Sequence, residues 1–323
     1  MLTNNFSDAN VNTSKSTFAD YLHLLRVRQW AKNLLLFAGL VFAGRLRAPQ
    51  GTEVFFSEAS RVVLAFICFC ALSSATYILN DWLDAPLDRL HPLKKNRPLA
   101  SGAISKTNAA IVLLGLLFIS IISEIAIIKI EPETLYFAIA ALGYFLLFVA
   151  YSLLLKHHVI VDVLCVAVGF VLRVVAGCLA IPVHISPWIL LCTFNLALFV
   201  SLCKRRAELA AAGDNSQTRK VLSDYSLPLL DPLIAACASL AVIAYSLYTF
   251  SASHADALGS FQNSSLLMLT IPLVVYGIFR YWFLALNTEV GEAPEKMLFD
   301  VPLIINGVLW VLMVVVLTVL AQL

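Results

Sequence analysis

Residues 61–88 read RVVLAFICFCALSSATYIL followed directly by NDWLDAPLD, and this stretch decides the fold. After Arg61, the first part carries no charged residue up to position 79. A helix needs about 20 mainly apolar residues to cross a bilayer. The second part holds three aspartates and an asparagine. The stretch therefore predicts a membrane-spanning helix that ends in an acidic cluster.

The whole chain has the composition of a membrane protein. Of its 323 residues, 60% are hydrophobic and 13% are charged, and the mean hydropathy is +0.87. Soluble domains have roughly 45–50% apolar and about 25% charged residues. This composition excludes a soluble enzyme, a disordered protein and a secreted disulfide scaffold. The seven cysteines form no C-x-x-C pair and lie almost entirely within hydrophobic runs, which is typical of small core residues.

Nine hydrophobic runs are candidates for membrane spans. They are Asn33–Gly44, 61–79, 108–128, 134–155, 159–179, 186–203, 232–250, 266–285 and 303–321. The first is the shortest and reaches spanning length only when Leu22–Trp30 is added. Most connections are short, which favours antiparallel neighbours. We expect an all-α membrane protein, a bundle of nine transmembrane helices, with one domain over residues 19–323 and a flexible tail over residues 1–18.

Three connecting segments are longer than the others, residues 81–106, 204–230 and 287–302. All three follow even-numbered spans, so they lie on the same side of the membrane. That side and the N-terminus carry 16 of the 22 Lys and Arg residues, against 4 on the opposite side and 2 within spans. Cytoplasmic loops are enriched in Lys and Arg. We therefore predict a cytoplasmic N-terminus and a functional site on the cytoplasmic side.

The acidic cluster has helical spacing. Asn80, Asp84 and Asp88 are four residues apart, and Asp81 precedes the last two by three and seven residues, so a continuous helix places all four on one face. Like charges packed this way need a compensating cation, and oxygen ligands favour a hard one such as Mg²⁺. The alternative is a solvated acidic helix end. Pro86 is the residue that would bend or end the helix inside the cluster.

Cations follow the carboxylates along the chain, at Arg89, Lys94, Lys95 and Arg97. A metal ion cannot neutralise every oxygen of a diphosphate, and Arg or Lys side chains take the remainder. An acidic segment followed by a basic one therefore indicates a site for a metal-bound diphosphate. The alternative is an ordinary cytoplasmic loop rich in Lys and Arg.

A further polar group lies at the fifth predicted span and consists of Tyr151, Lys156, Asp162 and Arg173. Asp162 and Arg173 are eleven residues apart, about three helical turns, so they share a face. A charge inside a span usually faces a partner or an aqueous cavity. Arg173 is therefore a candidate site residue, and a structural ion pair is the alternative. Two more basic segments, residues 26–32 and 204–206, either line the site or anchor lipid headgroups.

The spacing Asn80-x-x-x-Asp84-x-x-x-Asp88 resembles the first aspartate-rich motif of the UbiA superfamily of intramembrane prenyltransferases. Four further segments resemble the branch of that superfamily that contains decaprenyl-phosphate phosphoribosyltransferase. They are residues 25–35 (LRVRQWAKNLL), 91–102 (HPLKKNRPLASG), 169–177 (GFVLRVVAG) and 204–209 (KRRAEL). The resemblance runs from about residue 22 to the C-terminus.

The resemblance implies a nine-helix enzyme of a bacterial plasma membrane. It would transfer 5-phosphoribosyl from phosphoribosyl diphosphate to polyprenyl phosphate, with Mg²⁺, toward arabinose-containing cell-envelope polymers. By analogy, Mg²⁺ and diphosphate are held by Asn80, Asp81, Asp84 and Asp88. Substrate would be bound by Lys32, Asn33, Lys94, Lys95, Arg97, Tyr151, Lys156, Asp162, Arg173, Lys204 and Arg205. Asp162 is a single carboxylate where some relatives have a second D-x-x-x-D motif, so the number of metal ions stays open.

Two other functions fit parts of the same pattern. A UbiA-type aromatic prenyltransferase would use the aspartates with a polyprenyl diphosphate donor and a ring such as 4-hydroxybenzoate as acceptor. An ion-coupled transporter would also place Asp and Arg in the membrane. A transporter's acidic groups belong near the midplane, whereas Asp81, Asp84 and Asp88 are expected at a helix end.

Overall fold

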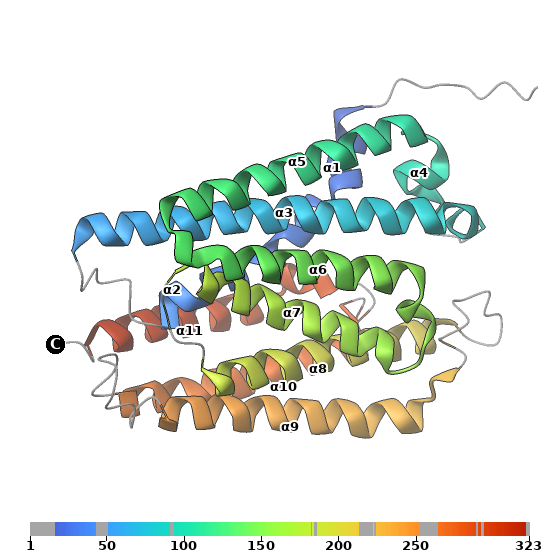
Figure 1. The fold of residues 1–323 in the computed structure, drawn as a ribbon. Coiled ribbons are helices and arrows are strands. Elements are labelled where there is room, and N and C mark those ends of the chain that lie inside the picture. The colour runs from blue at the N-terminus through green and yellow to red at the C-terminus, as the bar shows by residue number, and fades with distance from the viewer. Residues whose placement is uncertain are drawn as a thin grey trace, which may run out of the picture.

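The computed structural model describes residues 17–42, 51–90, 94–181, 183, 186–212, 222, 224–251, 264–288, 290–291 and 294–320. Within these ranges the chain forms helices joined by turns, with no strand (Figure 1). The expected all-helical class is therefore confirmed. The predicted tail, residues 1–18, lies almost entirely outside the described residues.

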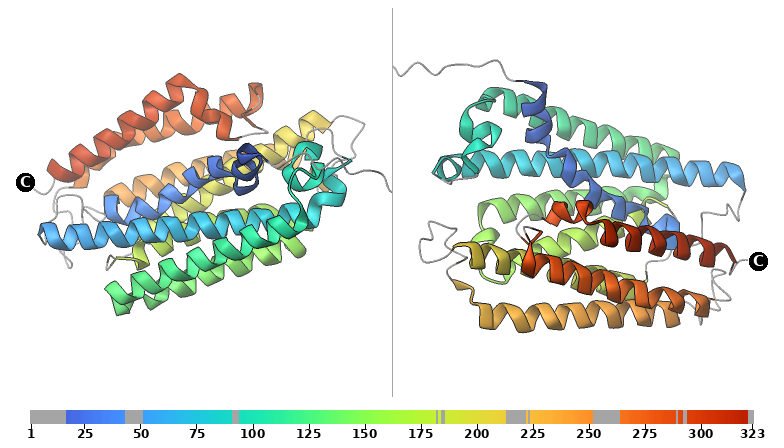
Figure 2. Two further views of the ribbon diagram at one scale, coloured as in Figure 1. Left: turned by 90° about the horizontal axis from the view of Figure 1, so that it is seen from above. Right: turned by 180° about the vertical axis from the view of Figure 1, so that it is seen from behind.

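Eight long helices run roughly parallel or antiparallel across the bundle (Figures 1 and 2). They are α3 (Thr52–Asp88), α5 (Lys106–Ile130), α6 (Leu135–Leu153), α7 (Val161–Leu179), α8 (Pro187–Ala212), α9 (Leu227–Ser251), α10 (Ile271–Asn287) and α11 (Val301–Leu320). Seven of the described helical segments, all but α11, are long and apolar enough to cross a membrane. The apolar part of α11, Val301–Leu317, is shorter.

The first predicted span, Asn33–Gly44, differs from the expectation. The N-terminal segment forms α1 (Phe18–Leu25), the 3₁₀ helix η1 (Val27–Phe37) and the short α2 (Ala38–Phe42). Among the described residues, this segment holds no single helix of spanning length. It runs obliquely over the bundle and contacts α3 and α7 (Figure 2, right). Its mixed polar sequence, with Arg28, Lys32 and Asn33 among apolar residues, suits a segment that packs against other helices.

Helix α3 continues through the whole acidic cluster. It contains 37 residues, so it is about 55 Å long at 1.5 Å per residue. Pro86 lies inside its last turn without ending it, and the backbone N–H of Arg89 still donates to the carbonyl of Ala85 at 3.2 Å. The shared face predicted for Asn80, Asp84 and Asp88 is thereby confirmed.

The interior includes two clusters with aromatic side chains at their centres, and the outside is apolar as well. Phe69, Phe137 and Tyr144 pack where α3, α6 and α7 meet, while Phe199 and Tyr281 pack between α8 and α10. Large apolar side chains are exposed along α5, α6, α9, α10 and α11. A monomeric soluble protein rarely exposes so many, so these surfaces suit contact with lipid.

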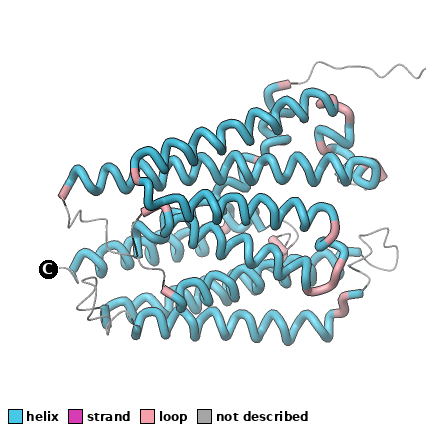
Figure 3. The backbone as a smooth tube through the Cα atoms, viewed as in Figure 1, coloured by secondary structure: helices cyan, strands magenta, loops and turns pink. Residues whose placement is uncertain are grey.

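The chain connections gather the predicted site residues at one end of the bundle, at the right of Figures 1 and 3. There α3 passes through η3 (Lys94–Asn96) and α4 (Pro98–Ser101) into α5, and α6 passes through η5 (Leu155–His157) into α7. The turn after α10 packs here too, because a Cβ on Gly291 would lie 2.6 Å from the Cβ of Ala207 in α8. The three longer segments therefore approach the same end.

The N-terminal segment docks on α7 through Gly177, which yields a first prediction. A Cβ at this position would lie 2.0 Å from the carbonyl oxygen of Leu36. We expect Gly177→Ala to push η1 off α7 and to lower the midpoint of thermal unfolding in detergent by several degrees.

Gly143→Ala in α6 is the matched control, because nothing lies within 4 Å of its Cβ position. It should leave the midpoint unchanged or raise it slightly, since Ala is the better helix former. Equal midpoints for the two variants would contradict the docking.

Candidate active site

The carboxylates of α3 are paired with cations from three other elements. The Nη1 of Arg97 lies 3.1 Å from the Oδ1 of Asp81 and 2.7 Å from the Oδ2 of Asp88, and so bridges the two. Both aspartates are buried, at 3% and 5% exposure. Because Arg97 directly precedes α4, the turn η3–α4 carries this cation back onto the last turns of α3. Arg97 therefore lies against the acidic cluster.

Lys156 is the partner of the remaining carboxylate. Its Nζ lies 2.6 Å from the Oδ1 of Asp84 and donates to the Oδ1 of Asn80 at 3.2 Å. Asn80 in turn donates its amide to the Oδ2 of Asp84 at 3.0 Å. Lys156 is 5% exposed, and it reaches α3 because η5 brings the chain back before α7 begins. Lys156, at least 72 positions further along the chain, thus forms one hydrogen-bonded group with Asn80 and Asp84.

Arg26 supplies a cation that the sequence assigned only to a basic segment. Its Nη2 lies 2.5 Å from the Oδ1 of Asp81, and its guanidinium stacks on the ring of Tyr77 at 4.7 Å. The backbone of Arg26 has φ +50°, in the left-handed region that non-glycine residues rarely adopt. This conformation ends α1 and turns the chain into η1, so a strained residue carries a cation directly at the acidic face.

The donor set suits a hard metal ion, although its present partners are cations. Asp81, Asp84, Asp88 and Asn80 offer only oxygen ligands, which Mg²⁺ prefers. In the described part of the chain, no group of three or more His, Cys, Asp and Glu side chains is already arranged to hold a metal. Arg97 and Lys156 contact the oxygens that would bind one, so metal binding at this face requires these cations to move aside.

Asp162 is the centre of a second, closed network. It is fully buried, with its Oδ2 accepting from the Nε of Arg205 at 2.7 Å and its Oδ1 accepting from the hydroxyl of Tyr225 at 2.7 Å. Arg205 also pairs with Glu208. Burial, together with the hydrogen bond to Asp162, raises the pKa of Tyr225, so its hydroxyl remains a donor at neutral pH. Both oxygens of Asp162 are therefore already engaged.

The second strained residue of the described chain adjoins this network. Ile160 has φ +68° immediately before α7, a conformation that is costly for a β-branched side chain. Its backbone N–H donates to the hydroxyl of Tyr225 at 2.8 Å. This backbone conformation fixes where α7 begins. It therefore fixes the position of Asp162 relative to the end of α8.

Arg173 forms a third network deeper in the bundle. Its Nε donates to the Oδ1 of Asn33 at 2.8 Å, its Nη2 to the hydroxyl of Tyr144 at 2.6 Å and its Nη1 to the carbonyl of Gly169 at 3.0 Å. Arg173 is 3% exposed. The partners found for Arg173 are neutral groups, and Asp162, on the same helix, pairs with Arg205. Arg173 instead ties η1 to α6 and α7.

Tyr77 lies where these networks meet, and the sequence did not single it out. Its hydroxyl lies in the electrostatic field of Lys32, Arg173, Arg26 and Lys204. These cations come from η1, α7, the end of α1 and α8. The Nζ of Lys32 also lies 5.9 Å from the ring centre of Phe170. The structure thus concentrates positive charge around a tyrosine four residues before Asp81.

The remaining predicted residues lie at the edge of the site. Lys94 and Lys95 lie in η3, next to Arg97, and Lys95 is exposed. Tyr151 is half-buried and lies in the electrostatic field of Arg205. Lys204 approaches Glu208 at 4.0 Å. Sequence reasoning also missed Tyr225, because it lies in a connecting segment 63 residues from its partner Asp162.

The comparisons with known proteins agree with this fold. The chain belongs to the UbiA prenyltransferase family, since the family's model matches residues 35–299. It is therefore a transferase of a multi-pass membrane family.

Its relatives narrow the class. The chain is 31% identical to a decaprenyl-phosphate phosphoribosyltransferase of Mycolicibacterium smegmatis, over 92% of both chains. It is 30% identical to the protein of that name in Corynebacterium glutamicum, over 90% of this chain and 84% of the relative. The structure of a UbiA homolog from Archaeoglobus fulgidus bound to GPP and Mg²⁺ is 20% identical, with a TM-score of 0.67 over 93% of this chain and 99% of that one. The last likeness shows the fold.

The Asp162–Arg205 pair generates a prediction about stability. Arg205→Gln leaves Asp162 buried beside a neutral amide, which should destabilise the protein by about 3–5 kcal/mol. Arg205→Gln combined with Asp162→Asn removes the uncompensated charge and should recover part of that loss. Denaturant unfolding in detergent micelles measures both. Additive effects of the two substitutions would contradict a coupled pair.

Proposed function

We propose that this enzyme transfers 5-phosphoribosyl from phosphoribosyl diphosphate to a polyprenyl phosphate, with Mg²⁺ and release of diphosphate. The observation that carries the proposal is the carboxylate face of α3, with Arg97, Lys156 and Arg26 paired against it. Carboxylates and cations at one place are what a metal-bound diphosphate requires. The relatives named for this reaction, similar over about nine-tenths of the chain, support it.

Asp84, Asp88, Asn80 and Asp81 are the residues that would hold Mg²⁺. When bound there, the ion supplies positive charge to the leaving diphosphate. Arg97 and Lys156 lie within 2.7 Å of the same carboxylates, so they are placed to bind diphosphate oxygens once a metal replaces them. Lys94 and Lys95, in the adjacent turn, would contact outer phosphate oxygens.

The reaction needs charge stabilisation more than a strong base. An oxygen of the polyprenyl phosphate attacks C1 of the ribose, the C1–O bond breaks, and diphosphate leaves with the electron pair. The acceptor oxygen is already anionic at neutral pH, so no proton has to be removed. Negative charge grows on the leaving group, and preorganised cations stabilise it. Arg97, Lys156 and Arg26 would do this at the end of α3.

The second half of the site would position substrate and not bind a second metal. Both oxygens of Asp162 are engaged by Arg205 and Tyr225, which favours one Mg²⁺ per site. Asp162 then acts as a positioning residue for Arg205. Tyr151, next to Arg205, would contact substrate from the end of α6.

Lys32 and Lys204 would attract the acceptor. Lys32 in η1 and Lys204 in α8 both act electrostatically on the hydroxyl of Tyr77. Asn33 and Arg173 hold η1 in place beside them and add to the positive potential. A phosphate on a lipid chain would enter this region from the apolar side of the bundle, whereas the diphosphate would lie at the end of α3.

The cellular setting belongs to the same proposal. Phosphoribosyl diphosphate is a soluble metabolite, and the acidic face lies at the bundle end whose connections carry most of the Lys and Arg residues. We infer a cytoplasmic site in a bacterial plasma membrane, with product used for arabinose-containing envelope polymers. An aromatic prenyltransferase with a polyprenyl diphosphate donor is the second candidate, because the same carboxylate face would serve it.

Asp84 provides the test of the metal assignment. Asp84→Asn should lower turnover of purified enzyme at saturating Mg²⁺ by at least about 10³-fold, because it removes a charged ligand and the partner of Lys156. Chelation of Mg²⁺ with EDTA should stop the wild-type reaction, and added Mg²⁺ should restore it. Glu53→Gln, at the exposed far end of α3, is the matched control and should keep wild-type rates. Wild-type turnover by Asp84→Asn would refute the assignment.

A labelled-donor assay separates the two candidate reactions. Membranes that contain the enzyme are incubated with phosphoribosyl diphosphate labelled in the ribose and with a polyprenyl phosphate. Label should move into the organic phase, because the ribosyl group becomes attached to the lipid. Transfer from a polyprenyl diphosphate to 4-hydroxybenzoate, without any lipid labelling from the ribosyl donor, would establish the aromatic prenyltransferase instead.

A further inference from the structure

A buried arginine lies at the end of the bundle opposite the active site. Arg61 of α3 precedes Asp81 by twenty residues, so the two are about 30 Å apart along the helix. This equals the thickness of the hydrocarbon core of a typical bilayer. Arg61 is 3% exposed, which is unusual for an arginine. It therefore lies at the other membrane interface, outside the site described above.

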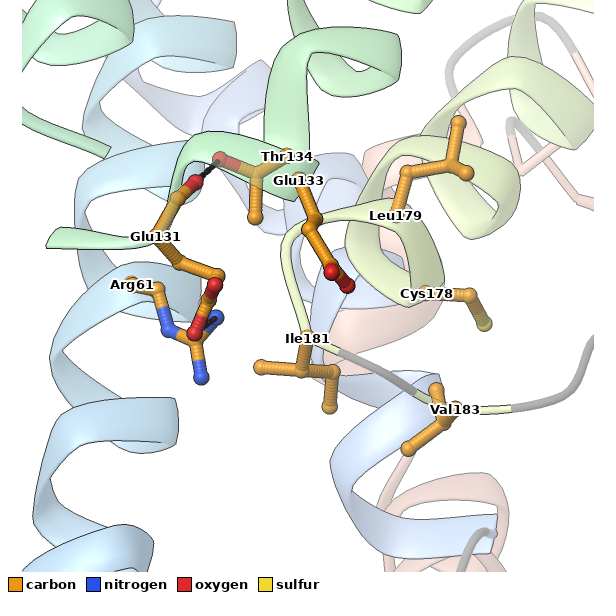
Figure 4. A pocket seen from close by; sticks show the side chains of 8 residues that line it. All are labelled: Arg61, Glu131, Glu133, Thr134, Cys178, Leu179, Ile181 and Val183. Atoms are coloured by element: carbon orange, nitrogen blue, oxygen red, sulfur yellow. Dashed lines mark hydrogen bonds and ion pairs between the residues drawn. The ribbon is translucent and has the colours of Figure 1, made fainter. Parts of the chain in front are cut away.

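Arg61 borders a pocket of about 220 Å³ (Figure 4). The wall on one side is the turn between α5 and α6, with Glu131, Glu133 and Thr134. The wall on the other side is the end of α7 and the residues after it, which are apolar and comprise Cys178, Leu179, Ile181 and Val183. Figure 4 shows the guanidinium of Arg61 and the carboxylates of Glu131 and Glu133 directed into the same space.

The guanidinium has unused hydrogen-bond donors. Among the described residues, neither Nε nor Nη1 of Arg61 has a hydrogen-bond acceptor. The Oε2 of Glu131 lies 3.9 Å from Nη1, close enough for attraction and too far for a hydrogen bond. A buried donor without an acceptor is costly. Anionic oxygens of a ligand would provide acceptors for these donors.

The carboxylates decide what kind of anion fits. Glu131 and Glu133 together outweigh the single charge of Arg61, so they would repel a simple phosphate. A group that carries both an ammonium and a phosphate answers both requirements, since the phosphate accepts from Arg61 and the ammonium donates to the glutamates. We propose that this pocket binds an aminoethyl phosphate group, as in the headgroup of phosphatidylethanolamine.

The surroundings favour a lipid as the source of that group. Half of the lining is apolar, and the pocket opens at the expected level of the headgroups, beside exposed apolar residues of α5 and α6. A bound headgroup would join α3, the α5–α6 turn and the end of α7. At their other ends, α3 and α7 carry Asp84 and Asp162, and α6 leads into η5 with Lys156. Occupancy would therefore brace the scaffold of the active site.

Native mass spectrometry tests the proposal. Delipidated protein is titrated with phosphatidylethanolamine or with phosphatidylglycerol, which has the phosphate without the amine. Wild-type protein should retain phosphatidylethanolamine about tenfold better, as expected for the charge-assisted hydrogen bonds between its ammonium and the glutamates. Arg61→Gln should lower the retention of both lipids, because both carry the phosphate that Arg61 would bind. Equal retention of the two lipids by wild-type protein would overturn the proposal, as would unchanged retention of both lipids in Arg61→Gln.

Two further variants keep the test decisive. Glu133→Gln changes an exposed residue and should fold even if Arg61→Gln does not. It should reduce the retention of phosphatidylethanolamine and leave that of phosphatidylglycerol unchanged or higher, so an unchanged preference would again overturn the proposal. Lys129→Gln, an exposed residue near the same end of α5 that does not line the pocket, should behave as wild type.

The source of the group is settled by soluble phosphoethanolamine. Calorimetric binding of this compound to protein in phosphatidylglycerol nanodiscs, lost in Arg61→Gln, would identify the free metabolite as an occupant. Retention of phosphatidylethanolamine without such binding would identify the lipid. Both outcomes support the aminoethyl phosphate site. If the protein binds neither compound, the proposal is contradicted. None of these readouts depends on catalytic activity, so their outcome is independent of whether the proposed transferase reaction is correct.

Discussion

Asp81, Asp84 and Asp88 lie on one face of a helix that is buried for most of its length, where their carboxylates repel one another. The rest of the site compensates this repulsion. Three ionised carboxylates in such an environment require nearby cations. Arg26, Arg97 and Lys156 come from three different elements to provide them. Each arrives through a break in regular helix: the left-handed turn at Arg26, the η3–α4 turn, and η5 between α6 and α7. The irregular segments therefore lie where cations must reach the carboxylates of α3.

The two halves of the site differ in how readily their ion pairs can exchange. Arg97 and Asp84 keep 21% and 15% of their side-chain surface exposed, so solvent or substrate can reach them. Asp162 keeps 1%, and both its oxygens are engaged. The face on α3 is thus suited to give up its cations to a ligand, whereas the network on α7 is suited to hold its shape. This asymmetry agrees with a single metal site next to a rigid second wall.

Local patterns were sufficient for one half of this site. The spacing of Asn80, Asp84 and Asp88 predicted their common face, and hydropathy predicted the long helices from α3 onward. Tertiary partners could not be predicted in the same way. Arg173 shares a face with Asp162 by spacing, yet packing turns it to Asn33 and Tyr144 instead.

Other features leave little trace in the sequence. Tyr225 lies in a connecting segment and is recognised only from its hydrogen bond to Asp162. The 3₁₀ helix η1 overlaps the first predicted span but docks against α7, where Gly177 allows the backbones to touch. Positive φ at Arg26 and Ile160 contradicts local preference, and only the surrounding contacts hold these residues in place.

A structure determined in a lipid nanodisc with Mg²⁺ and phosphoribosyl diphosphate would show whether the carboxylates of α3 exchange their cations for a metal ion. We expect density for a metal ion against Asp84 and Asp88, with Arg97 and Lys156 released from these carboxylates and bound to the diphosphate. A donor bound elsewhere, with the Arg97–Asp88 and Lys156–Asp84 pairs intact, would contradict it.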